Sequence, residues 1–412
     1  MTGLYERFVA KCNTIEVPQA DSELKEDIET LSVILKEDAS RHNLKYIRYN
    51  AIKALSYFTM DPDMKVRKIA ISTMEELCAK DSNLLPQLID DVRNSLQKLG
   101  HRGKDEQNGL KPQLGLALKG DKIMSDWKSQ GGLKDIPIFN TILLNLPRNQ
   151  ISENLWWIRP GILSLLDDTT DLRGIKLNGV KLLGTLVDRC FIDVSDKWIS
   201  FKETGLFDLT EPMVRNLCYY LPPTYSMEDS ISVFEAVIPT LRCLYKAQYD
   251  IKDCKDMIGA KILSQILLQH VIPRIGIRYE KLSELVISDI MCPMIRSLGE
   301  TCVPYLQRII FTVGEYLVRD PFITTSKSLV NAIINVLESV IDAAGYDNER
   351  IIAHQYDFLA MIIILFEKCE NEGIVNDLIL KKLKALVFRL NLNGSDIESM
   401  KHERVRLNKL FS

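Results

Sequence analysis

The chain is 412 residues long, with 46% hydrophobic and 26% charged residues and a net charge of −3. This length can bury one large core or several, and the composition is that of a globular protein rather than a disordered or fibrous one. The balanced charge gives no reason to expect nucleic acid or an acidic membrane as the main partner.

Cysteine usage and hydropathy predict the compartment. The nine cysteines form no CxxC pair, and an odd number cannot all pair within one chain, which is typical of a reducing compartment. The amino-terminal segment is too charged for a signal peptide. The longest apolar run, Phe358 to Phe366, is about half of what a bilayer span requires. We therefore expect a cytoplasmic and nuclear protein.

Residues 1–99 are predicted to form an amino-terminal, HEAT-like helical region. An apolar stripe at helical spacing runs through Met64–Lys80, at Val66, Ile69, Ala70, Met74 and Leu77. An Asp-Pro-Asp turn at Asp61 and Asp63 leads into this helix, which opens Val-Arg at Arg67. The second helix of a HEAT repeat begins in this way, so we expect an acidic elbow between two packed helices here.

Gly100–Asp135 differs from the rest of the chain. It holds seven of the twenty glycines and a mixture of charges. This composition predicts a flexible loop over residues 100–135, between the amino-terminal region and a longer solenoid over residues 136–412.

Along almost all of residues 136–412, apolar residues recur at the spacing of an α-helix. Two apolar stripes illustrate it, one through Leu155, Ile158, Ile162, Leu165 and Leu166, the other through Ile175, Gly179, Leu182, Leu183 and Leu186. Strand-like alternation is hard to find. The predicted fold class is all-α, an α-solenoid of HEAT-like helical hairpins, in which each hairpin buries its apolar face against a neighbour.

Two adjacent carboxylates, Asp167 and Asp168, separate these two stripes. As the elbow of a hairpin they would end the first helix, where they oppose its dipole and attract cations. The nearest basic residues in the sequence that could provide these cations are Arg173 and Lys176. Gly179, on the second stripe, would let a neighbouring helix approach closely.

The alternative is a chemical site built on the same pair. Paired carboxylates can act as acid and base when burial separates their pKa values, and they can bind a hard cation if further oxygen ligands lie nearby. No such ligands stand at loop spacing, and no histidine lies between His101 and His270. The elbow is the favoured interpretation. Thr170 or Asp171 would then cap the second helix.

Motifs of catalysis are missing from the sequence. It contains no GxSxG, HExxH or GxGxxG, so we expect no catalytic residue, no cofactor and no metal site. Of the adjacent Trp156 and Trp157, one should be core and the other exposed. The basic amphipathic run Leu380–Leu390 could bind a helix groove or an acidic surface, but a terminal helix with a solvated face is favoured.

Several stretches resemble the family called Tel-two-interacting protein two. The segment WWIRPGILSLLDDTTDLRGIKLNGVKLLGTL matches its signature at Trp157, Pro160, Leu165, Leu166, Asp167, Asp168, Lys176, Leu177, Gly179, Leu182 and Leu183. Downstream, its Thr-Gly-Leu element corresponds to Thr204, Gly205 and Leu206, and its Leu-Pro element to Leu221 and Pro222. Ser297–Phe322 resembles a terminal helix pair.

The likeness covers roughly Ile151 to Glu370, and the first 150 residues carry no recognisable signature. At Ala344–Ile352, where the family often has Trp-Pro-Arg-Ile, only Arg350 and Ile351 remain.

This resemblance implies a function. Members of the family are small, non-enzymatic subunits of the three-part TTT co-chaperone complex, with two larger helical-repeat proteins. That complex works with the ninety-kilodalton heat-shock chaperone and its adaptors to mature and assemble phosphatidylinositol-3-kinase-related kinases of the ATM, ATR and TOR class. The implied roles are therefore indirect ones in telomere maintenance, DNA-damage response and TOR signalling, with a chromatin-associated assembly in fungi.

Two other functions fit the residues alone. A helical-repeat scaffold of karyopherin or trafficking type would have the same periodicity without kinase clients. A hydrolase would use the Asp167–Asp168 pair and depend on a metal.

Overall fold

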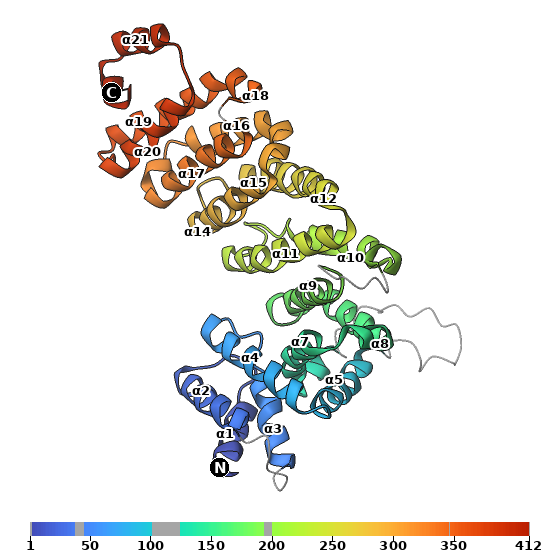
Figure 1. Cartoon of the computed structure of the whole chain (residues 1–412). Coiled ribbons are helices and arrows are strands. Elements are labelled where there is room, and N and C mark those ends of the chain that lie inside the picture. Colours follow the sequence, from blue (N-terminus) through green and yellow to red (C-terminus); the bar gives the residue numbers. More distant parts are fainter. Residues whose placement is uncertain (1, 38–44, 101–123, 193–199, 346, 412) are drawn as a thin grey trace. The chain divides into compact units, whose positions relative to one another are not determined.

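The computed structural model describes residues 2–37, 45–100, 124–192, 200–345 and 347–411. Every regular element in these ranges is helical, so the predicted all-α solenoid is confirmed (Figure 1). The chain divides into two compact units, Met1–Met213 and Val214–Ser412. No helix in the described ranges is both long and apolar enough to span a membrane.

The first unit stacks helices in the manner of a repeat protein. α1 packs on α3, α2 on α4, α5 on α7 and α7 on α9, and the neighbouring helices α8 and α9 also pack on each other. The helices are α1 (Thr2–Thr14), α2 (Ser22–Glu37), α3 (Lys45–Ser56), α4 (Met64–Lys80), α5 (Leu84–Gly100), α7 (Asp135–Asn145), α8 (Arg148–Leu166) and α9 (Leu177–Phe191). α10 (Leu206–Leu217) crosses from this unit into the next.

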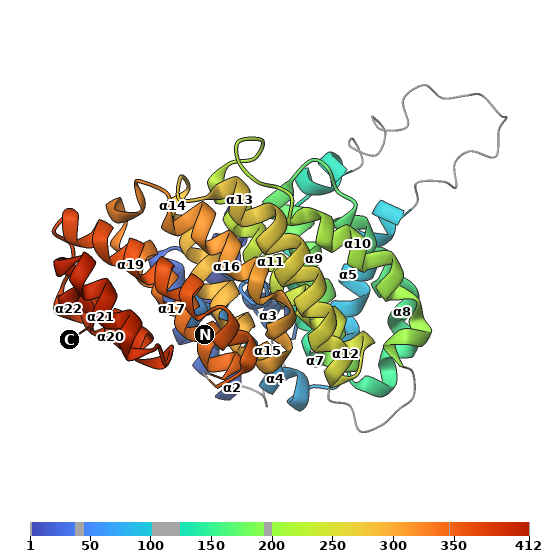
Figure 2. The same cartoon turned by 90° about the horizontal axis from the view of Figure 1, so that it is seen from above.

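The second unit continues the same principle with longer, composite helices. α12 (Ile251–Met257) runs on through a π-helical stretch, Ile258–Val271, into α13 (Ile272–Ile275). The others are α11 (Met227–Gln248), α14 (Glu280–Glu284), α15 (Cys292–Leu298), α16 (Leu306–Val313), α17 (Lys327–Ala344), α18 (Glu349–Ala353), α19 (Gln355–Asn371), α20 (Asp377–Arg389), α21 (Gly394–Glu403) and α22 (Asn408–Phe411). α15 packs on α17, and α17 and α19 both pack on α20 (Figure 2).

The apolar stripes read from the sequence lie in the core. On α4, Val66, Ala70, Met74 and Leu77 are buried, while Ile69 is half-buried. On α8 and α9 the same holds for every predicted position except Leu155, which is half-buried. Periodicity therefore located these faces correctly.

Part of the predicted 100–135 loop is helical. Residues 124–129 are helical, and Gly132–Lys134 form a short 3-10 turn leading into α7. Residues 101–123 lie outside the described residues, and the predicted division at 1–99, 100–135 and 136–412 stays a prediction.

Candidate functional site

The elbow between α8 and α9 is organised around the carboxylate of Asp168. Asp167 ends α8 as its C-cap, and the side chain of Asp168 is only 3% exposed. Its Oδ2 accepts the amides of Thr170 and Asp171 at 3.2 and 2.8 Å, and its Oδ1 accepts the Thr170 hydroxyl at 2.9 Å. These three donors hold the turn that reverses the chain, and they satisfy a charge that burial would otherwise make costly.

Asp171 begins the second helix of the hairpin. Its Oδ1 accepts the Gly174 amide at 2.7 Å, and its Oδ2 pairs with Lys128 from helical residues 124–129. Burial alone would raise the pKa of the Asp171 carboxyl, but the hydrogen bonds from Lys128 and from the Gly174 amide outweigh it and lower that pKa below its ordinary value. The helix starts as a π turn, Leu172–Lys176, before α9.

The two basic residues predicted to neutralise this elbow, Lys176 and Arg173, differ in their contacts. The ammonium of Lys176 donates to the main-chain carbonyl oxygen of Asp168 at 2.9 Å, so it binds the end of α8 and not the carboxylate. This placement still complements the negative end of the α8 dipole. Arg173 is exposed on the π turn.

Gly179 brings α8 and α9 together. A Cβ built there would lie 2.9 Å from the Cβ of Leu165 and 3.0 Å from the amide nitrogen of Leu166, closer than side-chain atoms normally come. The next turns of α9 bury Leu182 and Leu183 completely or nearly so. The hairpin is therefore closed by direct contact of the glycine with the backbone of α8.

The two tryptophans of α8 face different ways. Trp157 is buried, donates its Nε1–H to Asn154 Oδ1 at 2.8 Å, and lies with its ring centroid 5.2 Å from that of Phe139. Trp156 is 58% exposed, with the Arg93 guanidinium 6.0 Å from its ring centroid. Pro160 sits inside α8 on the exposed side.

The other signature residues also form turns. Thr204 ends a 3-10 turn, its hydroxyl accepts the Leu206 amide at 3.2 Å, and Gly205 follows with φ of 64°. In the second unit Leu221 is buried, and the carbonyl oxygen of Pro222 accepts the Nε–H of Arg274 at 3.0 Å. Thr204 and Leu206 line a hollow together with Leu155 and Arg159 of α8.

The Asp61–Asp63 elbow, before α4, repeats the arrangement. Asp61 is fully buried and accepts the amides of Ala20 and Asp63 at 2.7 and 2.8 Å. Asp63 caps α4 by accepting the Lys65 amide at 2.8 Å and pairs with Lys25 at 2.7 Å. The hydrogen bond from Lys25 lowers the pKa of the Asp63 carboxyl. Arg67 is half-buried in the first turn of α4.

The two elbows share one design. In each, a buried aspartate binds main-chain amides, and a second aspartate caps the next helix and takes a lysine from another segment. Carboxylates engaged in this way hold the backbone and leave few lone pairs for a metal or a substrate. In the described ranges no group of three or more His, Cys, Asp or Glu side chains is placed to hold a metal ion.

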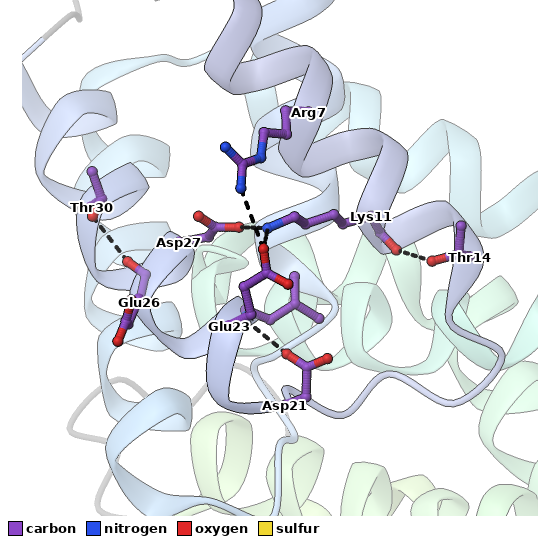
Figure 3. Close-up of polar contacts among 9 residues, drawn as sticks. Arg7, Lys11, Thr14, Asp21, Glu23, Glu26, Asp27 and Thr30 are labelled. Carbon is purple, nitrogen blue, oxygen red and sulfur yellow. Dashed lines mark hydrogen bonds and ion pairs between the residues drawn. The ribbon is translucent and has the colours of Figure 1, made fainter.

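A cluster of ion pairs on the first unit joins α1 to α2 (Figure 3). Lys11 lies between Glu23 and Asp27, 2.6 Å from a carboxylate oxygen of each, and Arg7 pairs with Glu23 at 3.3 Å. Hydrogen bonds to Asp27 and Glu23 raise the pKa of Lys11, and the bond from Lys11 lowers that of Glu23. Because the charges are paired and partly exposed to solvent, we interpret the cluster as a connection between α1 and α2 and not as a catalytic centre.

The surface of the second unit carries an open apolar groove along α19. One hollow of about 280 Å³ lies between α19 and the α16 helix, lined by Phe311, Gly314, Val318, Ala360, Met361 and Ile364 among others. A second of about 320 Å³ continues toward α21 and is lined by Ile363, Met400 and Leu407. Ala360 and Ile364 line both hollows. Polar side chains line both hollows as well: Gln307, Glu315, Arg319, His354 and Asp357 in the first, and Glu403 and Arg404 in the second.

Comparison with known proteins shows which family the chain belongs to. The model of the Tti2 family matches residues 51–325, two thirds of the chain and both elbows. The chain belongs to the Tti2 family. A curated relative, TEL2-interacting protein 2 of Saccharomyces cerevisiae, is 40% identical over 356 residues, which cover 82% of this chain and 82% of the relative. No solved structure matches.

The resemblance seen in the sequence is thus confirmed. The family match begins at residue 51, so it also covers part of the first 150 residues, where no signature was recognisable in the sequence. The Asp61–Asp63 elbow falls inside the match. The Tti2 family is not a known enzyme family.

Sequence reasoning missed the lysines at both elbows. Lys128 and Lys25 are 43 and 38 residues away from the aspartates that they pair with, so no local pattern could assign them. The capping residues themselves were within reach, because an aspartate just before an apolar helix is a recognisable N-cap.

Proposed function

We propose that the chain is a non-enzymatic adaptor subunit of the TTT co-chaperone complex. The observation that carries this is family membership, with a relative that is 40% identical over most of both chains and is named for interacting with TEL2. Its partners in the complex are the larger HEAT-repeat subunits.

Within that complex, the chain acts with the ninety-kilodalton heat-shock chaperone and its adaptors in maturation of the phosphatidylinositol-3-kinase-related kinases. These clients link it indirectly to telomere maintenance, DNA-damage response and TOR signalling. It works in the cytoplasm and nucleus, without binding nucleic acid or membrane directly.

The architecture supports an adaptor role in physical terms. Stacked helices expose long surfaces built from many small contacts, which suit large protein partners. The signature carboxylates bind the chain's own amides, and the α19 groove offers an open apolar surface with a charged rim. These features serve protein binding better than chemistry on a small molecule.

The test is affinity purification from cells, followed by depletion. The purified chain should bring the larger helical-repeat subunits with it, and depletion should lower the steady-state amounts of several giant kinases while their transcripts stay level. Re-expression of the chain should restore them. Co-purification with transport factors alone, with kinase amounts unchanged on depletion, would instead favour a scaffold of karyopherin or trafficking type.

A further inference from the structure

The helix α20 has two contrasting faces. One face buries Ile379, Leu383, Leu386 and Val387 against neighbours that include α17, α19 and α22. The helix is held at its start by Asn376, whose side chain accepts the Ile379 amide at 2.8 Å. Figures 1 and 2 show it beside α19, and Figure 2 shows it near α22. α20 is thus a fixed part of the second unit.

The opposite face is apolar at both ends and open to solvent. Phe388 is 88% exposed and Leu378 is 59% exposed; Lys381 and Ala385 lie between them and are exposed too. Phe388 is the most exposed large hydrophobic side chain in the described ranges. A helix at the surface of a globular protein normally turns a polar face toward solvent, so this apolar surface departs from what solubility alone would favour.

The spacing of these four residues is that of a helix-pairing seam. Leu378, Lys381, Ala385 and Phe388 follow one another at intervals of three, four and three, which places them at successive a and d positions of a heptad. Residues at this spacing lie along one line on a helix and can interdigitate with a second helix crossing at a shallow angle. A small residue, Ala385, in the middle would let that helix come close.

The charges beside the seam are nearly all basic. Lys382, Lys384 and Arg389 occupy the flanking e and g positions, and Asp377 is the one acidic residue there. Lys382 reaches Asn335 Oδ1 at 3.1 Å and Arg389 pairs with Asp342 at 2.7 Å. Within the described part of the chain, Lys381 and Lys384 form no ion pair, which leaves two cations available to a partner.

We propose that this face of α20 binds an acidic amphipathic helix of another protein, with apolar residues on its seam and glutamate or aspartate on its flanks. Charges at e and g select partners in paired helices, so the basic flanks specify acidic ones. A second copy of this chain would bring the same lysines face to face and is disfavoured for that reason. The inference rests on the proposed function only in taking the partner to be a protein.

The experiment uses the full chain and two designed helical peptides of about three heptads, with leucine at a and d. One peptide carries glutamate at e and g, the other lysine, and each bears a fluorophore for anisotropy. We expect the glutamate peptide to bind at least about tenfold more tightly than the lysine peptide, with an affinity that falls as salt rises.

Variants locate the binding surface. Phe388→Ser should weaken glutamate-peptide binding at least about tenfold, as loss of a central aromatic anchor does. The double change Lys381→Glu and Lys384→Glu should reverse the preference toward the lysine peptide. Phe322→Ser is the matched control, because Phe322 is an aromatic residue 66% exposed elsewhere on the second unit, and it should bind as the unaltered chain does. Circular dichroism melts check that each variant is folded.

Equal binding of the two peptides, or a Phe388→Ser variant that binds normally, would overturn the inference. Sedimentation showing that Phe388→Ser breaks a dimer would assign the face to a second copy, and binding to anionic vesicles or to duplex DNA with no peptide binding would assign it to those surfaces; each would overturn it too. If peptides bind as expected but no TTT subunit co-purifies, the proposed function fails alone. If the subunits co-purify and peptides do not bind, this inference fails alone.

Discussion

At the scale of single residues, the aspartates of the two elbows act on the backbone. Asp168 and Asp61 are the buried members, and each accepts two main-chain amides. A buried carboxylate is tolerated where such donors replace its hydration. The acidic pair that suggested chemistry in the sequence is therefore a device for reversing the chain between helices.

Asp171 should make stability depend on acid pH. Its folded pKa lies below its ordinary value, so its contribution is present above pH of about 4 and is lost as the pH falls through the folded pKa. Asp171→Asn keeps a capping side chain but not the charge, and should flatten the acid side of the stability profile. Asp171→Ala should cost about 1 kcal/mol at neutral pH through loss of the cap. Urea unfolding from pH 3 to 7 measures both; identical profiles for Asp171→Asn and the unaltered chain would contradict the assignment.

Gly179 should tolerate no side chain without movement of the helices. Gly179→Ala places a Cβ against the backbone of Leu166, and overpacking of this kind costs about 1–3 kcal/mol. Gly3→Ala in α1 is the control, since nothing lies within 4 Å of a Cβ there. Thermal melts should separate the two. Partner binding should weaken in proportion to the lost stability, and loss of binding at an unchanged melting temperature would move Gly179 to the interface itself.

At the scale of elements, helix α8 separates what the sequence could and could not predict. Its apolar spacing predicted the buried stripe that ends at Leu165 and Leu166, and the acidic pair predicted the end of the helix. Adjacent tryptophans must face different sides, but nothing local decided which one is core. Trp157 is the buried one, and it packs against Phe139 of α7, a contact that the local sequence does not show.

The same distinction holds for the elbow as a whole. Helix periods and caps are local and can be read from neighbouring residues, whereas Lys128 is brought to Asp171 by the packing of segments far apart in the sequence. The π turn before α9 likewise has no sequence signal that we recognise. The helices and their caps could therefore be predicted from the sequence, whereas the contacts between segments far apart in the chain could not.

The two faces of α8 should respond differently to truncation. Trp157→Ala removes a buried ring and should cost about 3–5 kcal/mol, as large-to-small core changes do. Trp156→Ala removes an exposed ring and should change stability by less than about 0.5 kcal/mol. Chemical denaturation gives both values, and comparable losses for the two variants would contradict the placement of the rings.

At the scale of the whole molecule, seven of the nine cysteines are buried, and they lie in both units. Cys12, Cys190, Cys302 and Cys369 are all buried, and burial raises the pKa of the first two to about 12 and of the last two to about 11. A thiol of such pKa holds almost no thiolate near neutral pH, and the thiolate is the reactive form.

We therefore expect these four cysteines to react slowly with a thiol reagent in native protein at pH 7.5. These four cysteines should be modified only when the units unfold, so their labelling should rise with denaturant along the same curve as the loss of helical circular dichroism. Mass spectrometry of digested samples identifies the cysteines modified at each step. Fast labelling of Cys190 in native protein would show that the carboxyl end of α9 opens on its own.

The positions of the tryptophans have a practical consequence for anyone who studies the chain in solution. All four precede residue 214, so the second unit contains none. Intrinsic emission is thus a spectroscopic reporter confined to the first unit, while tyrosine and helical signals sample both. A shift in that emission on adding a partner would localise the response to one half of the chain without any attached dye.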